Sequence, residues 1–173
     1  FIKIKYRCGD VLKKGWVNLD LINKKCLQLD LREKLPFKPS SVSEIYSEHF
    51  LEHLSENYAL QFIEESYRVL IPGGLFSVGV PDGEVLLESY VNDLKIDDYK
   101  ILDINKYLPI NPSKMQVVNL MFRSFGHQYT YDYETMEKIL KSVGFQKINK
   151  REFDPLRDSN HRKDWTLYVD AFK

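Results

Sequence analysis

Cysteine, net charge and long apolar runs are what this sequence has least of, and each shortage excludes a class of protein. Two cysteines, Cys8 and Cys26, are too few for a disulfide framework or a cysteine-rich zinc site. Basic and acidic residues number 25 each, so nothing electrostatic favours a nucleic acid or an acidic membrane as partner. No apolar run approaches the roughly 18 residues of a membrane-spanning helix, and no signal peptide is recognisable. We therefore expect a cytoplasmic protein that binds neither nucleic acid nor membrane.

Length and composition are those of one globular domain. The chain has 173 residues, enough for a sizeable core, and no repeat or linker divides it. We expect a single domain over residues 1–173. A segment at about 84–126 mixes charges, prolines and aromatic residues, which is typical of an insertion. Such an insertion is where a substrate cap would form over a rigid sheet.

The stretch from Val42 to Asp82 has the clearest pattern in the chain. A short β-prone run at 42–46 is followed by Ser55 and Glu56, which suit a helix start with a side-chain cap and a favourable charge. The helix should bury the residues that recur at three- and four-residue spacing, Leu60, Ile63, Tyr67 and Leu70. Helix after strand indicates the first half of a βαβ unit.

The same stretch then returns to a strand. Pro72-Gly73-Gly74 cannot continue a helix, so the helix should end there. Apolar residues alternate afterwards, as in a strand, at Phe76, Val78 and Val80. Two strands that flank one helix predict a parallel sheet.

Three shorter β-prone runs precede this unit, at 2–6, 15–20 and 26–31. The first strand of a doubly wound sheet is normally buried on both faces, which suits Lys3 and Lys5 poorly.

Two helices and a hairpin are expected after the unit. Residues 84–92 and 117–121 have helical potential, and Asp132 and Gly144 suit the start and stop of a clear helix. Two β-prone runs, at 145–153 and 165–172, would form a closing hairpin.

Several of these segments, in this order, resemble one family. SEHFLEHL at 47–54, RVLIPGG at 68–74 and VPD at 80–82 resemble the middle of a class I methyltransferase that uses S-adenosylmethionine, and the chain is most similar to the methyltransferase type 11 group. The likeness continues through CGD, GWVNLD, QLDL and LPF upstream and FGHQYTYDYETMEKILKSVGF downstream. It implies a Rossmann-like three-layer α/β sandwich, with a mostly parallel seven-stranded sheet, an antiparallel last strand and helices on both faces.

The resemblance implies S-adenosylmethionine as cofactor, S-adenosylhomocysteine as product and a small molecule as methyl acceptor. In open α/β sheets, ligands lie at the carboxyl ends of the strands. Asp20 is placed there for the ribose diol, and the resemblance places Asp30 at the adenine edge. The residues expected to bind cofactor are Arg7, Cys8, Gly9, Asp20, Leu21, Asp30, Leu31, Ser47, Glu48 and His49. The plainer alternative for both aspartates is that they only cap the loops after their strands.

The first strand departs from the family pattern. The family has a Gly-x-Gly turn after an acidic or Asn residue, whereas Arg7 stands at the first glycine position and Lys5 at the acidic one. Glycine lets the backbone approach a ligand and adopt positive φ, and Lys5 would repel the ammonium of the cofactor. Three interpretations stay open: Arg7 pairs with the cofactor carboxylate, the cofactor binds weakly, or the fold serves as a non-catalytic binding or regulatory protein.

His49-Phe50-Leu51-Glu52-His53 also matches H-x-x-E-H, the signature of inverted zinc peptidases. Such a site needs a third ligand, for which Glu64 and Glu65 are the nearest candidates. The motif directly follows a strand instead of lying within a long helix. A zinc hydrolase is therefore the third alternative, and no metal site is expected.

His127, just before the last predicted helix, is the candidate general base. The ordinary pKa of imidazole suits removal of a proton from an acceptor hydroxyl or amine. Many methyl transfers need no base, because the sulfonium is a strong electrophile and positioning supplies most of the rate. Loop packing is the alternative role of His127.

Overall fold

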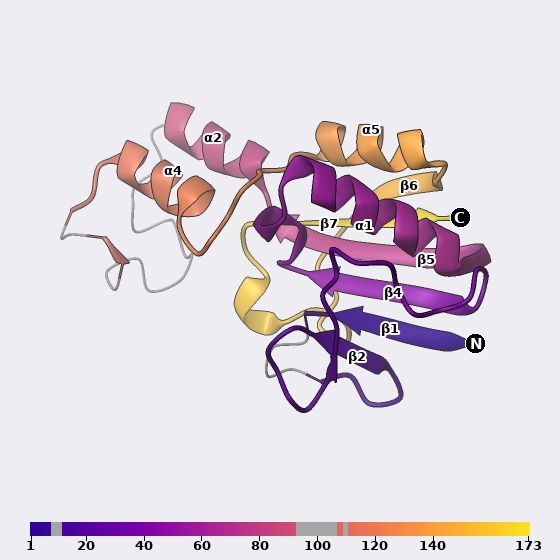
Figure 1. Ribbon diagram of the computed structural model, residues 1–173. Coiled ribbons are helices and arrows are strands. Elements are labelled where there is room, and N and C mark those ends of the chain that lie inside the picture. The colour runs from indigo at the N-terminus through magenta and orange to yellow at the C-terminus, as the bar shows by residue number, and fades with distance from the viewer. Residues whose placement is uncertain (8–11, 93–106, 109–110) are drawn as a thin grey trace.

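The computed structural model describes residues 1–7, 12–92, 107–108 and 111–173, and its centre is one seven-stranded sheet (Figure 1). The strand order is β3-β2-β1-β4-β5-β7-β6. The strands are β1 (Ile2–Tyr6), β2 (Val17–Asp20), β3 (Leu27–Gln28), β4 (Val42–Glu48), β5 (Leu70–Pro81), β6 (Gln146–Arg151) and β7 (Thr166–Phe172). Of the seven strands, β7 alone runs antiparallel to the others, so the expected Rossmann-like sheet with an antiparallel last strand is confirmed.

The winding of the sheet reverses between β1 and β4. From β1 the chain moves outward through β2 and β3, then returns to add β4 and β5 on the other side of β1. The carboxyl ends of β1, β2 and β4 therefore meet at a topological switch point, where open α/β sheets bind their ligands.

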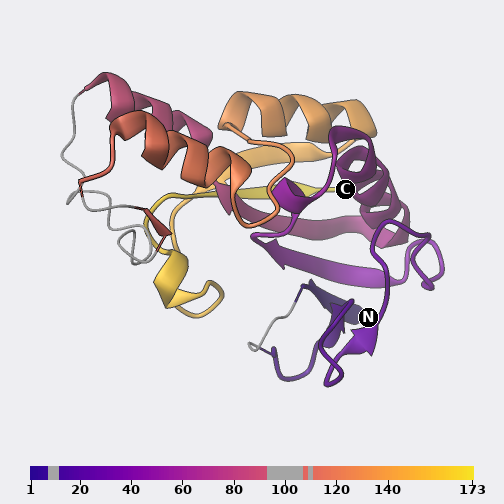
Figure 2. The same ribbon diagram turned by 60° about the vertical axis from the view of Figure 1, so that its left-hand side comes forward.

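Four α-helices and two short 3-10 helices complete the described chain. They are η1 (Leu51–His53), α1 (Glu56–Val69), α2 (Gly83–Val91), α4 (Lys114–Arg123), α5 (Tyr133–Val143) and η3 (Asn160–Arg162). The helices α1 and α5 lie side by side on one face of the sheet, and α2 and α4 pair with each other beyond the carboxyl ends of the strands (Figures 1 and 2). Among the described residues, no helix has the length and hydrophobicity that a membrane-spanning segment requires.

The main core lies between the sheet and the pair α1 and α5. Ile4, Ile45 and Phe76 are neighbours across β1, β4 and β5, and all three are fully buried. Phe62 of α1 contacts the ring of Tyr6 edge-on at 4.8 Å. A smaller cluster, centred on Leu86, Val117, Val118 and Met121, joins α2 to α4.

The opposite face of the sheet is polar, which explains the two lysines of β1. Lys3 pairs with Glu44 at 2.7 Å, and Lys5 is 3% exposed, with its ammonium 6.0 Å from the ring centre of Tyr46. The hydroxyl of Tyr46 donates to Asp158, in the segment 154–164 that covers this face. That layer is therefore largely irregular chain, where the resemblance implies helices.

Helix α1 differs from its prediction in three respects. Its buried stripe is Ala59, Phe62, Ile63, Ser66 and Val69, whereas Leu60 is 37% exposed. Small residues share the buried face, so the apolar spacing alone identified only Ile63 of this stripe. Ser55 occupies the N-cap position but its side chain makes no capping hydrogen bond. The helix ends at Val69, and Pro72-Gly73-Gly74 lies within β5, where the register with β4 shifts.

The predicted strands at 15–20 and 26–31 are shorter in the structure. The second strand begins at Val17, because Gly15 adopts φ 81° in a turn. The third contains only two residues, both exposed at the edge of the sheet, where one neighbour supplies all pairing. The last helix agrees with its prediction, since Asp132 accepts from the Thr135 amide and Gly144 ends it at φ 112°.

Candidate functional site

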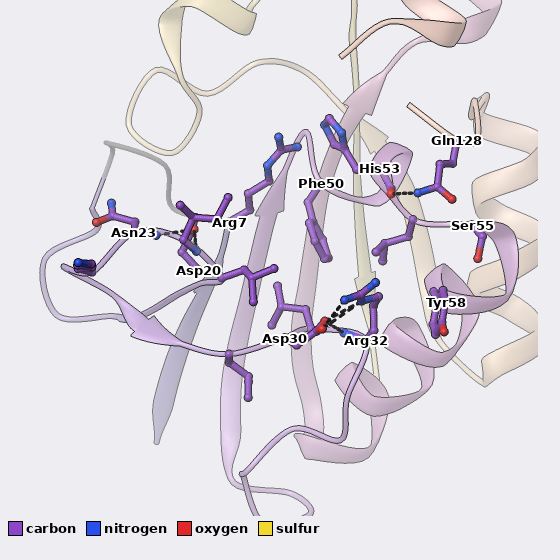
Figure 3. Close-up of a pocket in the computed structure, with 16 residues that line it drawn as sticks. Arg7, Asp20, Asn23, Asp30, Arg32, Phe50, His53, Ser55, Tyr58 and Gln128 are labelled. Atoms are coloured by element: carbon purple, nitrogen blue, oxygen red, sulfur yellow. Dashed lines mark hydrogen bonds and ion pairs between the residues drawn. The ribbon is translucent and has the colours of Figure 1, made fainter. Parts of the chain in front are cut away.

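A cavity of about 930 Å³ opens at the carboxyl ends of the strands, on the β1–β2–β3 side of the switch point (Figure 3). Of the residues expected to bind cofactor, Arg7, Asp20, Leu21, Asp30 and Leu31 line this first cavity. Ser47, Glu48 and His49 do not line it, and Cys8 and Gly9 lie outside the described residues.

Asp20 forms part of the wall of the first cavity where β2 ends. Its Oδ1 accepts hydrogen bonds from the amides of Ile22 at 2.9 Å and Asn23 at 3.0 Å. These bonds fix the carboxylate and shape the following turn, as Asp side chains commonly do. Asp20 is 8% exposed, so a ligand in the cavity would meet a preoriented acceptor.

Asp30 contributes a second carboxylate, and Arg32 neutralises it. Arg32 donates from Nε and Nη2 to the two carboxylate oxygens, at 2.6 to 3.1 Å (Figure 3). These hydrogen bonds lower the pKa of Asp30 to about 2. Asp30 lies past the short β3, in a loop, and not at a strand end as expected.

Arg7 adopts the backbone conformation that the family pattern assigns to glycine. Its φ is 44°, in the left-handed region that non-glycine residues seldom occupy. Its Nη1 donates to the carbonyl of His49 at 2.6 Å, and burial lowers the pKa of the guanidinium. The side chain therefore reaches from the carboxyl end of β1 to that of the neighbouring β4, in the wall of the first cavity (Figure 3).

Glu48, at the end of β4, holds the C-terminal segment to the sheet. Its carboxylate accepts from the Ser159 amide and hydroxyl and from the Tyr168 hydroxyl, at 3.1, 2.6 and 3.1 Å. Ser47, the preceding residue, is fully buried.

A second cavity of about 450 Å³ adjoins the first, and Arg7 and His53 line both. Its wall also includes Glu52 and three further histidines, His49, His127 and His161. Aromatic residues complete the lining at Tyr107, Phe125 and Trp165.

Sequence reasoning considered Glu52 only as part of the H-x-x-E-H motif and did not include it among the expected site residues. Glu52 is 1% exposed, and neither carboxylate oxygen accepts a hydrogen bond within the described part of the chain. Burial raises the pKa of Glu52 to about 7. Its Oε1 lies 3.6 Å from His49 Nδ1, 3.6 Å from His53 Nε2 and 4.0 Å from His127 Nε2. The available signal was its position between two histidines in HFLEH.

The three histidines around Glu52 are held neutral. Burial is the main cause in each: it lowers the pKa of His53 to about 4, that of His49 well below its usual value, and that of His127 in the same direction. Neutral imidazole can accept a proton or ligate a metal through its unprotonated nitrogen.

The zinc peptidase arrangement expected from H-x-x-E-H is not formed. His49 adopts φ 51° just past β4, and only the last three residues of the motif lie on η1, so the two histidines are not on one face of a long helix. Of the proposed third ligands, Glu65 pairs with Arg68 at 2.8 Å and accepts from the Leu35 amide at 2.9 Å. Its side chain is thus engaged away from the motif.

Comparison with protein families finds a match over residues 9–78 to a family described as a methyltransferase domain. The comparison with curated proteins gave no match.

Solved structures share the fold across nearly the whole chain. A SAM-dependent methyltransferase from Archaeoglobus fulgidus has 14% identity and a TM-score of 0.62, over 99% of this chain and 85% of that one. A possible histamine N-methyltransferase from Thermotoga maritima has 14% identity and a TM-score of 0.60, over 99% and 82%. PigF, solved with SAH, has 11% identity and a TM-score of 0.58, over 99% and 50%.

Proposed function

Because residues 9–78 match a methyltransferase domain and the chain has the fold of class I methyltransferases, we propose that this protein transfers a methyl group from S-adenosylmethionine to a small molecule. The observation that carries the proposal is the first cavity, which opens at the switch point of the sheet and contains the carboxylate of Asp20 at the end of β2 and that of Asp30 in the loop after β3.

The residues of the first cavity fit this cofactor. About 930 Å³ is at the upper end of the range that ligand pockets occupy, roughly 300 to 1,000 Å³. Leu29, Leu31 and Phe50 provide apolar walls for a flat base. Asp20 would accept from the ribose hydroxyls, and Asp30 lies further along the same wall, at the adenine end that the resemblance suggests.

Arg7 is assigned to the anionic end of the cofactor. Its guanidinium lies at the border of the two cavities, where it would pair with a carboxylate. This assignment favours the first of the three interpretations of Arg7. Once bound, the cofactor supplies an electrophilic methyl group. The chain's own task is then to orient the ligand and keep water away.

The second cavity is assigned to the methyl acceptor, because it adjoins the first along Arg7 and His53. His127 lines this cavity and not the first, so it stands on the acceptor side. Its Nδ1 contacts the Met121 carbonyl at 2.6 Å, which turns Nε2 toward Glu52. The role of general base for His127 stays a prediction.

A non-catalytic binding protein is the second candidate. The observation that favours it is Arg7, whose side chain occupies space at the cavity border that glycine would leave open. On that account the first cavity would bind no cofactor, or would bind one without transfer.

Calorimetric titration of the full chain with S-adenosylmethionine and with S-adenosylhomocysteine tests the proposal. We expect micromolar binding, and about tenfold weaker binding for Asp20→Asn, which keeps the turn but loses the charged acceptor. Glu64→Gln, on the exposed side of α1, is the matched control and should bind as wild type. Absence of binding by folded protein would reject the proposal and favour the non-catalytic alternative.

The variant Arg7→Gly tests whether the side chain of Arg7 binds the cofactor or obstructs its site. If Arg7 holds the cofactor carboxylate, the variant should bind S-adenosylmethionine about tenfold more weakly. Tighter binding by Arg7→Gly would contradict this role and identify the side chain as an obstruction.

A further inference from the structure

Three of the four histidines of the chain surround one buried carboxylate. His49, His53 and His127 each place a ring nitrogen within 4.0 Å of Oε1 of Glu52. These separations exceed a hydrogen-bond length, and neither carboxylate oxygen has a hydrogen-bond partner among the described residues. A buried carboxylate without a partner is costly, so its surroundings should reveal what satisfies it.

The surroundings of His49 fix its tautomer. The hydroxyl of Thr166 donates to the Arg162 carbonyl at 2.7 Å, so the same oxygen accepts from Nε2 of His49 at 2.8 Å. Nε2 therefore carries the proton, and Nδ1 turns a lone pair toward Glu52.

The same holds for His127. Its Nδ1 lies 2.6 Å from the carbonyl of Met121, which can only accept, so Nδ1 carries the proton. Nε2 is left with a lone pair that faces Glu52 at 4.0 Å. A backbone carbonyl that fixes the far nitrogen of a histidine is the usual outer-shell partner of a metal ligand.

His53 also packs beside Glu52, and the backbone of Gly126 lies near its Nδ1. Its Nε2 faces Glu52 at 3.6 Å. Two of the three rings thus turn acceptor nitrogens toward an acceptor oxygen that Nε2 of His53 also faces, and this arrangement repels unless a positive charge lies between them. A proton on Glu52 could bridge to only one of the three rings.

We propose that Glu52, His53 and His127 bind a first-row transition-metal dication, of the class of zinc or manganese, in the wall of the second cavity. One ligand atom from each residue lies within 4.8 Å of the other two. Tetrahedral ligands about 2.0–2.1 Å from a metal are about 3.3 Å apart, so small inward side-chain movements complete the site. Imidazole ligands select this class over magnesium or calcium, which prefer oxygen.

Three protein ligands leave coordination positions open toward the second cavity. An acceptor hydroxyl bound there would lose its proton more easily, because a metal lowers the pKa of a bound oxygen acid. This role rests on the proposed function, whereas metal binding itself does not. With the metal bound, His127 is a ligand and not a free base.

Metal titration without cofactor tests the site. The full chain, stripped with chelator and shown to be folded by circular dichroism, is titrated with zinc and with manganese by calorimetry, and with cobalt(II) by absorption. We expect a single ion per chain, and a loss of affinity of about 100-fold or more in Glu52→Gln and in His127→Gln. His161→Ala is the matched control, because His161 lines the same cavity outside the group of three and should keep wild-type affinity.

Three results would overturn the proposal: no binding of any of the three metals by folded wild type, wild-type affinity in Glu52→Gln, or an equal loss in His161→Ala. Titration with S-adenosylmethionine in the presence of chelator is a separate measurement. Its failure would reject the proposed function and leave the metal site standing.

Discussion

Two buried glutamates four residues apart have opposite surroundings. Glu48 is 4% exposed, and its carboxylate accepts three hydrogen bonds, from Ser159 and Tyr168. Glu52 is 1% exposed, and its carboxylate accepts none within the described ranges, while three histidines face it. Glu48 ends β4 and Glu52 follows it on η1, yet only the carboxylate of Glu48 has hydrogen-bond donors around it.

The difference separates a structural acid from a functional candidate. Hydrogen bonds offset the cost of burying Glu48, and they tie the segment 154–164 to the polar face of the sheet. Nothing comparable offsets the burial of Glu52, so its site is complete only with a cation or a proton added. The exposed fraction alone does not distinguish the two glutamates, because both side chains are buried.

Among the substitutions that test this contrast, Glu48→Gln is expected to change the free energy of unfolding most. The amide keeps the size of the side chain but loses the charge and sets an NH2 group against donors, so the free energy of unfolding should fall by about 3 kcal/mol. Urea denaturation followed by circular dichroism measures it. A change below about 0.5 kcal/mol would mean that Glu48 is not the anchor of the segment.

The substitution Glu52→Gln is expected to stabilise the protein, in contrast to Glu48→Gln. The measurement is made in chelator at pH 8, where the carboxylate is ionised because its pKa is about 7. The substitution removes a buried unpaired charge and supplies an NH2 group that can donate to a facing imidazole, so the free energy of unfolding should rise by about 2 kcal/mol. The same denaturation experiment applies. Destabilisation similar to that of Glu48→Gln would abolish the contrast between the two sites.

The smallest change in the free energy of unfolding is expected for Ser159→Ala. This substitution removes the hydroxyl donor to Glu48 and so makes the surroundings of Glu48 more like those of Glu52. Loss of the 2.6 Å hydrogen bond from its hydroxyl should lower the free energy of unfolding by about 1 kcal/mol. Ser142→Ala, at an exposed position on α5, is the control and should change stability by less than about 0.5 kcal/mol. Equal effects in the two variants would show that the hydroxyl of Ser159 contributes nothing specific.

Local patterns predicted much of the fold, because they act through neighbours in the chain. Alternation at Phe76, Val78 and Val80 predicted β5, and Asp132 and Gly144 marked the ends of α5. Hydrophobic periodicity predicted the buried face of a helix less well where small residues take part in packing. Ala59 and Ser66 belong to the buried stripe of α1, and the apolar spacing did not include them.

The first cavity was accessible to sequence reasoning, and the second was not. The carboxyl ends of neighbouring parallel strands meet at one edge, so Asp20 could be placed near Arg7 before any coordinates were known. Glu48 was expected beside them, but its side chain points to the polar face, toward a segment that returns from the end of the chain. Strand alternation cannot reveal which distant segment covers a face.

The order of the elements and the parallel sheet follow from local sequence patterns, since hydrophobic periodicity and capping residues act over a few positions. Long-range packing places Lys5 in a polar layer, anchors the carboxylate of Glu48, and brings the ring of His127 against that of His53 beside Glu52. These outcomes depend on contacts between residues far apart in the chain. Burial and the direction of each side chain fix them, and no local pattern contains that information.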